Sequence, residues 1–358
     1  MAQDTTSSYR FSYFSSQTQK TVFSATWDDL LPSQSVEQLF PDKTSSEDDV
    51  WWLDIRDPSV QDVQAVSQAL SIHPLTAEDI IARETREKVE VFRNYYLMSF
   101  QTLVTGEDKD AFPSSAGVYI LVFHGGAVTF TPSGCGLVRR VRDRIRKMHA
   151  PSVLSADWIC YALIDDIVDS FEPLTLAAQR EVEAIEDQVF IARIADVKSL
   201  VPRIDTLRKK ISFVLRCLSG KIDVLNGFVK RCQTSSKPPV FPDGELILYL
   251  GDVQDHLVTT TSNLAHFDGI VRRSQANCLA QLSATNLRMG YKINSVISKL
   301  TVVATIVTPM HMLTWLFGMN VPVPGGDTDG LGWFFGIVGL ICAFSAVSFA
   351  VSYKLKLL

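Results

Sequence analysis

Two long apolar segments near the end of the chain constrain its fold more strongly than any other feature. Residues 300–317 and 331–353 contain no Asp, Glu, Lys or Arg. A helix that crosses the hydrocarbon core of a bilayer needs about 20 mostly apolar residues, with a range of about 17 to 25, so both segments are long enough. The alternative is a pair of core helices in a soluble protein, but a core helix of this length normally has a polar face. We therefore expect two transmembrane helices.

The distribution of positive charge predicts how these helices are oriented. Basic residues lie before the first segment and after the second: Arg288, Lys292, Lys299, Lys354 and Lys356. The connecting segment, residues 318–330, contains no Lys or Arg. Because positive charge is retained on the cytoplasmic side, we expect an integral membrane protein with both termini in the cytoplasm, in the plasma membrane or an internal, vacuolar-type membrane. The N-terminal sequence lacks the basic and apolar regions of a cleavable signal peptide.

The first apolar segment carries polar residues that the second largely lacks. Together with residues before the segment, they recur at alternate steps of three and four and form one stripe of a helix. The stripe consists of Asn294, Ile297, Thr301, Ala304, Thr308 and His311. Polar groups are unfavourable against lipid, and one narrow stripe encloses a pore only when several copies form a ring, so the pattern predicts an oligomer. In the alternative interpretation, the threonines hydrogen-bond to carbonyls of their own helix, which leaves the shared face of the asparagine and the histidine unexplained.

The part of the chain before the apolar segments begins with two regions of different pattern. Residues 1–48 are rich in Ser, Thr, Gln and Asp and are expected to be partly disordered. In residues 49–136, short apolar runs alternate with charged helical stretches, which is typical of a cytosolic α/β domain. The expected strands are Val50–Ile55, Val89–Phe92, Tyr95–Leu103, Gly117–Phe123 and Ala127–Phe130. The expected helices are Gln61–Ser71 and Thr76–Arg86, with Thr76 as the N-cap.

From residue 137 onward, the sequence is typical of helix almost throughout. A cytosolic helical region at 137–232 is followed by a Pro/Ser/Gly-rich break at 233–244. No proline then occurs before Pro309, so we expect one stalk helix over residues 245–317, about 110 Å long at about 1.5 Å per residue. This helix is continuous with the first transmembrane helix, at about 300–317. An external loop at 318–330, the second transmembrane helix at 331–353 and a cytosolic tail at 354–358 complete the chain.

The overall charge and the motif content exclude several functional classes. The net charge is −5, so the basic surface of a nucleic-acid-binding protein is missing and no nucleic-acid partner is expected. The six cysteines include no CxxC pair, which favours reduced thiols over a disulfide framework or a zinc site. Nucleotide-binding glycine motifs, GxSxG and HExxH are all absent, so no enzymatic activity is expected.

Gly318-Met319-Asn320 directly follows the first apolar segment. A Gly-Met-Asn tripeptide at this position is typical of the CorA superfamily, and the chain resembles that family along nearly its whole length. WLDI, HPLTAEDI, KVEVF, YALIDDIVD, GDVQDHL and LTVVATIVTPMHMLTWLFGMN all occur in family order, and GMNVPVPGG resembles the eukaryotic Alr-type branch. The resemblance implies a homopentameric funnel, with a long stalk helix that lines the pore and an outer ring of second transmembrane helices. It also implies a Mg²⁺ channel that works down the electrochemical gradient, while some members carry Co²⁺, Ni²⁺, Mn²⁺ or Zn²⁺.

The resemblance assigns Gly318, Met319 and Asn320 to the selectivity filter. Mg²⁺ gives up its first water shell reluctantly, and a ring of Asn320 carboxamides can accept hydrogen bonds from those waters without the cost of dehydration. Carboxylates at the same place would hold a dication too tightly for release. In the alternative interpretation, Asn320 caps the end of the helix and Gly318 relaxes the turn.

Four acidic residues form the regulatory metal sites that the resemblance implies: Glu78, Asp79, Asp165 and Asp252. In the family, matching positions bind regulatory Mg²⁺ between subunits, so Mg²⁺ is expected to be both the transported ion and the effector. Bound Mg²⁺ would bridge carboxylates that otherwise repel one another and would favour a closed ring. Without the resemblance, the same residues fit ordinary acids at helix starts or on solvated faces.

Two departures from the family pattern leave other functions open. Gly251 stands where an arginine is common, and His311 stands where a hydroxyl is more usual. Neutral imidazole is a good ligand for Zn²⁺, Ni²⁺ or Cu²⁺, so the alternative within the family, indicated by His311 alone, is a transporter of Zn²⁺ or another transition metal. Alternatively, His311 turns aside and bonds a carbonyl that Pro309 leaves free. Outside transport, the alternative is a non-conducting membrane scaffold or metal sensor.

Overall fold

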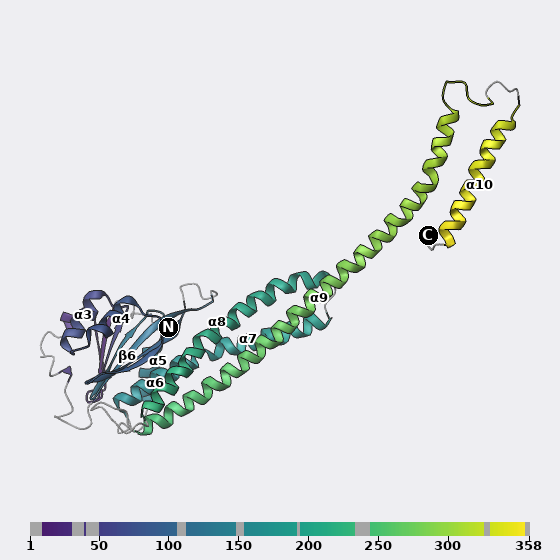
Figure 1. Ribbon diagram of the computed structural model, residues 1–358. Helices are drawn as coiled ribbons and strands as arrows, with labels where there is room; N and C mark the ends of the chain where they lie inside the picture. Colours follow the sequence, from purple (N-terminus) through teal and green to yellow (C-terminus); the bar gives the residue numbers. More distant parts are fainter. Residues whose placement is uncertain are drawn as a thin grey trace, which may run out of the picture. The chain divides into compact units, whose positions relative to one another are not determined.

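The computed structural model describes residues 9–30, 39–40, 50–105, 112–147, 154–191, 194–232, 244–325 and 330–354 (Figure 1). The chain divides into two compact units, Met1–Ile191 with Leu200–Ser274, and Ala192–Ser199 with Gln275–Leu358. The first unit contains an α/β domain and a group of helices, and the second contains two apolar helical segments. The fold class that the sequence predicts, an α/β domain with a long helix and two C-terminal apolar helices, is confirmed.

A seven-stranded mixed sheet forms the centre of the α/β domain, in the order β2-β1-β3-β7-β6-β5-β4. The strands are β1 (Phe11–Ser15), β2 (Lys20–Ser24), β3 (Trp51–Arg56), β4 (Lys88–Val91), β5 (Tyr95–Val104), β6 (Ser114–Phe123) and β7 (Gly126–Thr131). β3 and β7 run parallel, and every other neighbouring pair is antiparallel. At the parallel pair, a Cβ on Gly126 would lie 2.2 Å from the Trp51 ring, so only glycine fits this position.

Helices cover both faces of this sheet (Figure 1). The helices that begin in the first part of the chain are α1 (Trp27–Leu30), α3 (Val60–Ala69), α4 (Pro74–Ala82), α5 (Leu137–Lys147), α6 (Ala156–Asp169), α7 (Glu172–Ile191) and α8 (Ile194–Cys232). Alternate residues of a strand point to opposite faces. On β5, Leu97 joins the core that includes Val66 of α3 and Ile80 of α4, whereas the sulfur of Met98 lies 3.5 Å from that of Cys160 on α6.

A buried ion pair joins the α/β domain to helix α8. The side chain of Lys221 on α8 is 1% exposed, and that of its partner Glu87, just before β4, is 6% exposed. The Lys221 ammonium also lies over the rings of Phe100 and Phe171. A Cβ on Gly220 would lie 2.7 Å from the second oxygen of Glu87, so the glycine lets the carboxylate approach the helix. Burial lowers the pKa of Lys221 even though Glu87 acts to raise it.

A β-hairpin lies within the segment for which the sequence predicts partial disorder. β1 pairs with β2 on one side and with β3 on the other. Its aromatic residues Phe11 and Phe14 are buried, which supplies the apolar area that stabilises the edge of the sheet. The serines next to these aromatics, Ser12, Ser15 and Ser16, give the segment its polar composition. Residues 1–8, 31–38 and 41–49 lie outside the described residues.

The predicted start and end of the second helix of the α/β domain are wrong. The N-cap of α4 is His73, whose side chain accepts a hydrogen bond from the first turn. Thr76 is buried inside the helix, where its hydroxyl lies 2.8 Å from the hydroxyl of Tyr95. The helix ends at Ala82 because Arg83 adopts the left-handed conformation, with φ 51° and ψ 50°.

The long helix α9 (Gly244–Phe317) contains 74 residues and contributes to both units. It begins one residue before the predicted start, ends at the predicted residue and contains Pro309. The last helix is α10 (Gly332–Lys354), with 23 residues. In the described part of the chain, α9 and α10 are the two helices that are long and apolar enough to cross a membrane.

Candidate functional site

The predicted polar stripe lies on an uncovered face of α9. All six of its residues are exposed: Asn294, Ile297, Thr301, Ala304, Thr308 and His311. The half-buried residues of the same segment include Val302, Ile306, Met310 and Leu313. At about 100° per residue, this second set falls on roughly the opposite side of the helix from the stripe. The Met310 sulfur lies 3.6 Å from the Ser345 hydroxyl of α10, so α10 covers the side of α9 that faces away from the stripe.

The helix α10 meets α9 through a stripe of small and branched residues. Its half-buried or buried positions are Ile337, Ile341, Ser345, Ser348 and Ser352. Ser345 donates its hydroxyl proton to the Ile341 carbonyl at 2.7 Å, so the serine is satisfied in an apolar surrounding. Small residues at such spacing allow two helices to approach closely. The sequence pattern that indicates this face is the four-, three- and four-residue spacing of Ile341, Ser345, Ser348 and Ser352.

The threonines of the stripe hydrogen-bond to their own helix. Thr301 donates to the Ile297 carbonyl at 2.8 Å, and Thr308 donates to the Ala304 carbonyl at 2.8 Å. The alternative interpretation, in which the threonines donate to carbonyls of their own helix, is therefore confirmed for Thr301 and Thr308. It does not remove them from the uncovered face, since both side chains remain exposed. Local hydrogen bonding and a position on the stripe are thus compatible.

His311 stacks on Trp315, one turn further along α9. The two rings are 5.9 Å apart at an interplanar angle of 28°, and both side chains are exposed. The imidazole forms no hydrogen bond with the described residues, so the predicted alternative, a bond to a carbonyl freed by Pro309, is not observed among them. The ring nitrogens of His311 remain available to a ligand.

The tripeptide Gly318-Met319-Asn320 follows the last turn of α9. The N–H of Gly318 donates to the carbonyls of Thr314 and Trp315 at 3.0 and 3.2 Å, which closes the helix end. Asn320 is exposed, and its carboxamide forms no hydrogen bond with the described residues. The Gly318 backbone therefore caps the helix, and the Asn320 side chain takes no part in capping among the described residues.

The loop that follows is held against the start of α10. Gly325 has a φ of 90°, and a Cβ there would lie 2.4 Å from the Trp333 ring. Glycine is required both by this conformation and by this contact. Residues 326–329 lie outside the described residues.

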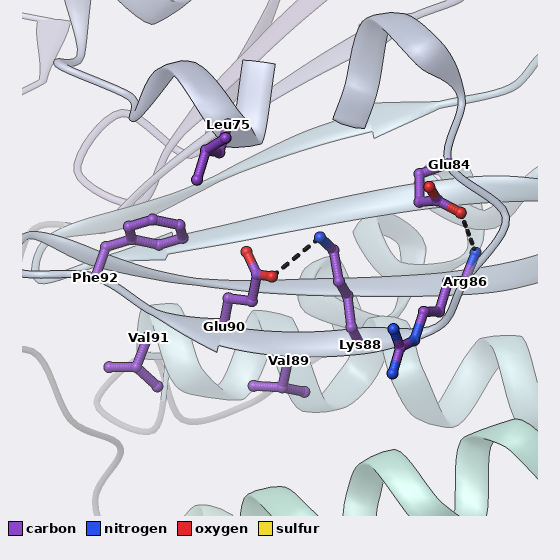
Figure 2. Close-up of a pocket in the computed structure, with 8 residues that line it drawn as sticks. All are labelled: Leu75, Glu84, Arg86, Lys88, Val89, Glu90, Val91 and Phe92. Atoms are coloured by element: carbon purple, nitrogen blue, oxygen red, sulfur yellow. Dashed lines mark hydrogen bonds and ion pairs between the residues drawn. The ribbon is translucent and has the colours of Figure 1, made fainter. Parts of the chain in front are cut away.

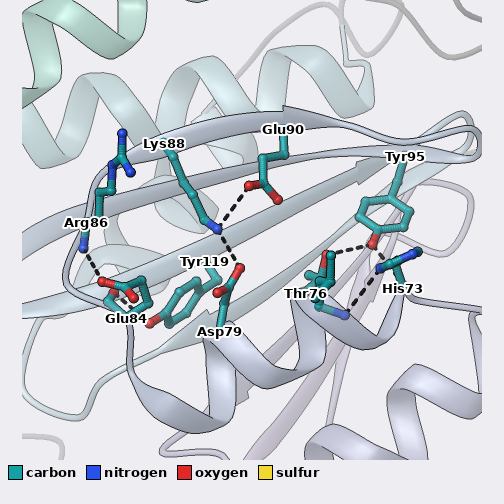
Figure 3. Close-up of polar contacts among 10 residues, drawn as sticks. His73, Thr76, Asp79, Glu84, Arg86, Lys88, Glu90, Tyr95 and Tyr119 are labelled. Carbon is teal, nitrogen blue, oxygen red and sulfur yellow. Dashed lines mark hydrogen bonds and ion pairs between the residues drawn. The ribbon is translucent and has the colours of Figure 1, made fainter.

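The regulatory candidates Glu78 and Asp79 lie on α4 in the first unit. Glu78 is exposed. The Asp79 carboxylate lies 2.6 Å from the Lys88 ammonium, which also lies 3.0 Å from Glu90 (Figure 3). Asp79 also raises the pKa of Tyr119, which burial, the larger cause, brings to about 12. Asp79 is therefore part of a local charge network and not an isolated surface acid.

The candidates Asp165 and Asp252 lie near one tyrosine in the same unit. Asp165, on α6, forms an ion pair with Arg144 at 2.5 Å. Asp252, on α9, is exposed and lies 3.9 Å from a nitrogen of His256. Burial raises the pKa of Tyr161, and the charges of Asp165 and Asp252 add to this effect. Asp165 and Asp252 thus both lie close enough to Tyr161 to affect its pKa.

A single copy of the chain does not bring the four carboxylates together. α4 packs on one face of the sheet and α6 on the other. Among the described residues, no group of three or more His, Cys, Asp or Glu side chains is arranged to hold a metal ion.

An α/β domain, a very long helix and two C-terminal helices that are long and apolar enough to cross a membrane define the architecture of the chain. The chain belongs to the CorA-like Mg²⁺ transporter family, whose model matches residues 47–354. This is a family of transporters and not of enzymes.

Known relatives are similar to nearly the whole chain. The Schizosaccharomyces pombe protein C27B12.12c is 42% identical over 351 residues, which cover 97% of this chain and 43% of the relative. Magnesium transporter ALR2 of Saccharomyces cerevisiae is 35% identical over 387 residues, which cover 97% of this chain and 45% of the relative. The chain spans about half the length of the curated relatives it matches.

A solved structure supports the fold. The CorA magnesium transporter from Methanocaldococcus jannaschii superposes with a TM-score of 0.59, covering 87% of this chain and 93% of that one. The two sequences are 18% identical, so this likeness concerns the fold alone.

Proposed function

We propose that five copies of this chain form a channel that conducts hydrated Mg²⁺ down its electrochemical gradient. The observation that carries this proposal is the uncovered stripe of α9, which lies opposite the face covered by α10. The stripe ends at His311, about two helical turns before Gly318-Met319-Asn320, where the Asn320 carboxamide has no hydrogen bond with the described residues. In a ring of copies, the stripes face one another and the α10 helices lie outside. The orientation has both termini in the cytoplasm, in agreement with the positions of the Lys and Arg residues.

In this mechanism, the carboxamides of Asn320 select the ion at the outer mouth. They accept hydrogen bonds from the first water shell, so Mg²⁺ enters without the dehydration that it resists. The membrane potential drives entry, because one elementary charge gains about 2.3 kcal/mol per 100 mV and a dication gains about twice that. No chemical fuel is needed, in agreement with a sequence that lacks nucleotide-binding motifs.

Regulation by cytosolic Mg²⁺ is the second part of the proposal. Glu78, Asp79, Asp165 and Asp252 are the proposed ligands, supplied by adjacent copies. Two of these carboxylates already hold a cation within one chain, Asp79 through Lys88 and Asp165 through Arg144. Bound Mg²⁺ joins adjacent copies and favours the closed ring, whereas its loss leaves carboxylates that repel one another.

Flux through purified protein in liposomes tests the channel directly. We expect entrapped Mg²⁺-sensitive dye to report uptake that increases with an inside-negative potential, and chemical cross-linking to give species up to a pentamer. A folded, oligomeric protein without flux would instead support the non-conducting sensor or scaffold.

Transport of a transition metal is the second candidate function, and one observation favours it. The His311 imidazole is exposed on the stripe and has no hydrogen-bond partner among the described residues. Neutral imidazole binds Zn²⁺ well and Mg²⁺ poorly. A ring of such imidazoles would either pass Zn²⁺ or be blocked by it.

His311→Thr is expected to relieve inhibition of Mg²⁺ flux by Zn²⁺. We expect the half-inhibitory Zn²⁺ concentration to rise at least about tenfold, because the only imidazole of the stripe is lost. The dye assay in liposomes measures both curves, and direct Zn²⁺ uptake is followed with a Zn²⁺-sensitive dye. His124→Thr, on an exposed turn of the α/β domain, is the matched control. Unchanged inhibition in His311→Thr would show that the histidine does not face the ion.

Removal of a regulatory carboxylate is expected to weaken protection by Mg²⁺. For Asp79→Ala or Asp252→Ala, we expect the Mg²⁺ concentration that half-protects the protein from trypsin to rise at least about tenfold, because ligand charge sets affinity. Asp205→Ala is the matched control, since Asp205 lies on α8 and pairs only with the exposed Lys209 among the described ion pairs. Equal protection of the variants and the wild type would identify both residues as ordinary surface acids.

A further inference from the structure

Lys88 lies between two carboxylates at the junction of α4 and β4. Its ammonium is 2.6 Å from an oxygen of Asp79 on α4 and 3.0 Å from an oxygen of Glu90 on β4 (Figure 3). Lys88 and Glu90 are separated by two positions and so point to the same face of the strand. The arrangement places a monovalent cation at a carboxylate pair.

The ammonium is held by hydrogen bonds to both carboxylates. The side chains of Lys88 and Asp79 are 23% and 20% exposed, so the ion pair is largely covered by protein. Lys88 therefore occupies Asp79 as a cation.

The same group borders an open pocket. Its lining includes Leu75, Glu84, Lys88, Glu90 and Phe92, and its volume is about 610 Å³ (Figure 2). Hydrated ions can reach Lys88 and Glu90 from this side. Lys88 and Glu90 are thus covered by the protein on one side and accessible to solvent on the other.

We propose that Lys88 is an internal competitor of the regulatory Mg²⁺ and sets the Mg²⁺ concentration at which the protein responds. This inference rests on the proposed regulatory role of Asp79. A Mg²⁺ ion bound to Asp79 and the Lys88 ammonium cannot share the same carboxylate oxygens without repulsion. When Mg²⁺ binds, Lys88 moves fully to Glu90, which already accepts its second hydrogen bond. Glu90 therefore provides the alternative position that makes the exchange possible.

A competing Lys88 and a purely structural Lys88 predict opposite effects on Mg²⁺ binding when the side chain is removed. If Lys88 only ties α4 to β4, its removal loosens the site and weakens Mg²⁺ binding. If Lys88 competes with Mg²⁺, its removal strengthens Mg²⁺ binding. Removal of Glu90 leaves the ammonium with Asp79 alone and weakens Mg²⁺ binding. The two neighbouring substitutions thus shift the Mg²⁺ response in opposite directions.

The test is a Mg²⁺ titration of trypsin protection on the full-length, detergent-solubilised protein. For Lys88→Met, we expect the half-protecting Mg²⁺ concentration to fall about 3- to 30-fold, the range for loss of a nearby positive charge in a largely aqueous surrounding. For Glu90→Gln, it should rise about 3-fold or more. Lys88→Arg should stay close to the wild type because the charge is kept. Lys209→Met is the matched control, since it removes one positive charge from an exposed ion pair on α8.

The outcomes separate this inference from the proposed function. Protection of the wild type that is lost in Asp79→Ala but unchanged or weakened in Lys88→Met would overturn the competitor role and leave Mg²⁺ regulation intact. A wild type that Mg²⁺ does not protect at all would overturn both. Thermal unfolding of each variant checks the fold, and if Lys88→Met does not fold, Glu90→Gln decides, because an unchanged or lower midpoint there contradicts the exchange.

Discussion

Asn320→Ala is expected to lower Mg²⁺ flux at least about tenfold while the oligomer stays intact. One hydrogen bond contributes about 0.5–1.5 kcal/mol, and a ring of five copies loses five such acceptors at the same step. A rise of only about 1.4 kcal/mol in the barrier suffices for a tenfold loss of rate. The fold should be unaffected, because the helix end is closed by the Gly318 N–H and not by the asparagine.

The measurement compares dye-reported Mg²⁺ uptake at equal protein density in liposomes. Asn263→Ala, which removes an exposed carboxamide from another part of α9, is the matched control and should transport like the wild type. Size-exclusion chromatography and cross-linking verify the assembly. Wild-type flux in Asn320→Ala, with intact oligomers, would show that the carboxamide does not contact the ion or its waters.

Lys221→Met should destabilise the first unit by about 3–5 kcal/mol, because it leaves the buried Glu87 carboxylate without its counter-ion. Both partners are almost fully buried, so solvent screening does not reduce the effect. An unfolding temperature about 6–20 °C lower corresponds to this loss for a unit of this size. Differential scanning fluorimetry of the full-length protein in detergent measures it.

The double variant Glu87→Gln with Lys221→Met separates charge from packing. It removes the unpaired charge, so we expect it to regain much of the lost stability. Lys209→Met, which breaks an exposed pair on the same helix, should cost at most about 1 kcal/mol. A loss in Lys221→Met no larger than in Lys209→Met would mean that water reaches Glu87 and stabilises it alone.

The elements that sequence patterns predicted well are those whose stability is local. The absence of proline before Pro309 predicted the long α9 helix, and runs without charge predicted the two apolar helices. β1 was missed because Ser12, Ser15 and Ser16 give this short aromatic run a polar composition. Its stability depends on pairing with β3, which is distant in sequence.

The wrong bounds of α4 and the unforeseen ion-pair partners of the carboxylates have the same physical origin. Thr76 fits the composition of an N-cap, but a hydroxyl contact with Tyr95 draws it into the core. The resemblance pointed to Asp79 and Asp165 as possible ligands, yet only the fold brings Lys88 and Arg144 to them. Residue type predicts what a side chain can bind, whereas its partner is determined by tertiary contacts.

The threonine hydrogen bonds of α9 have a consequence for the sign of the charge that this face favours. Thr301 and Thr308 commit their hydroxyl protons to helix carbonyls, so their oxygens can only accept further hydrogen bonds. The water shell of a cation turns its hydrogens outward, whereas that of an anion turns its oxygens outward. The oxygens of these two threonines can therefore accept hydrogen bonds from the water shell of a cation but cannot donate to that of an anion. The preference for cations arises here without a charged side chain.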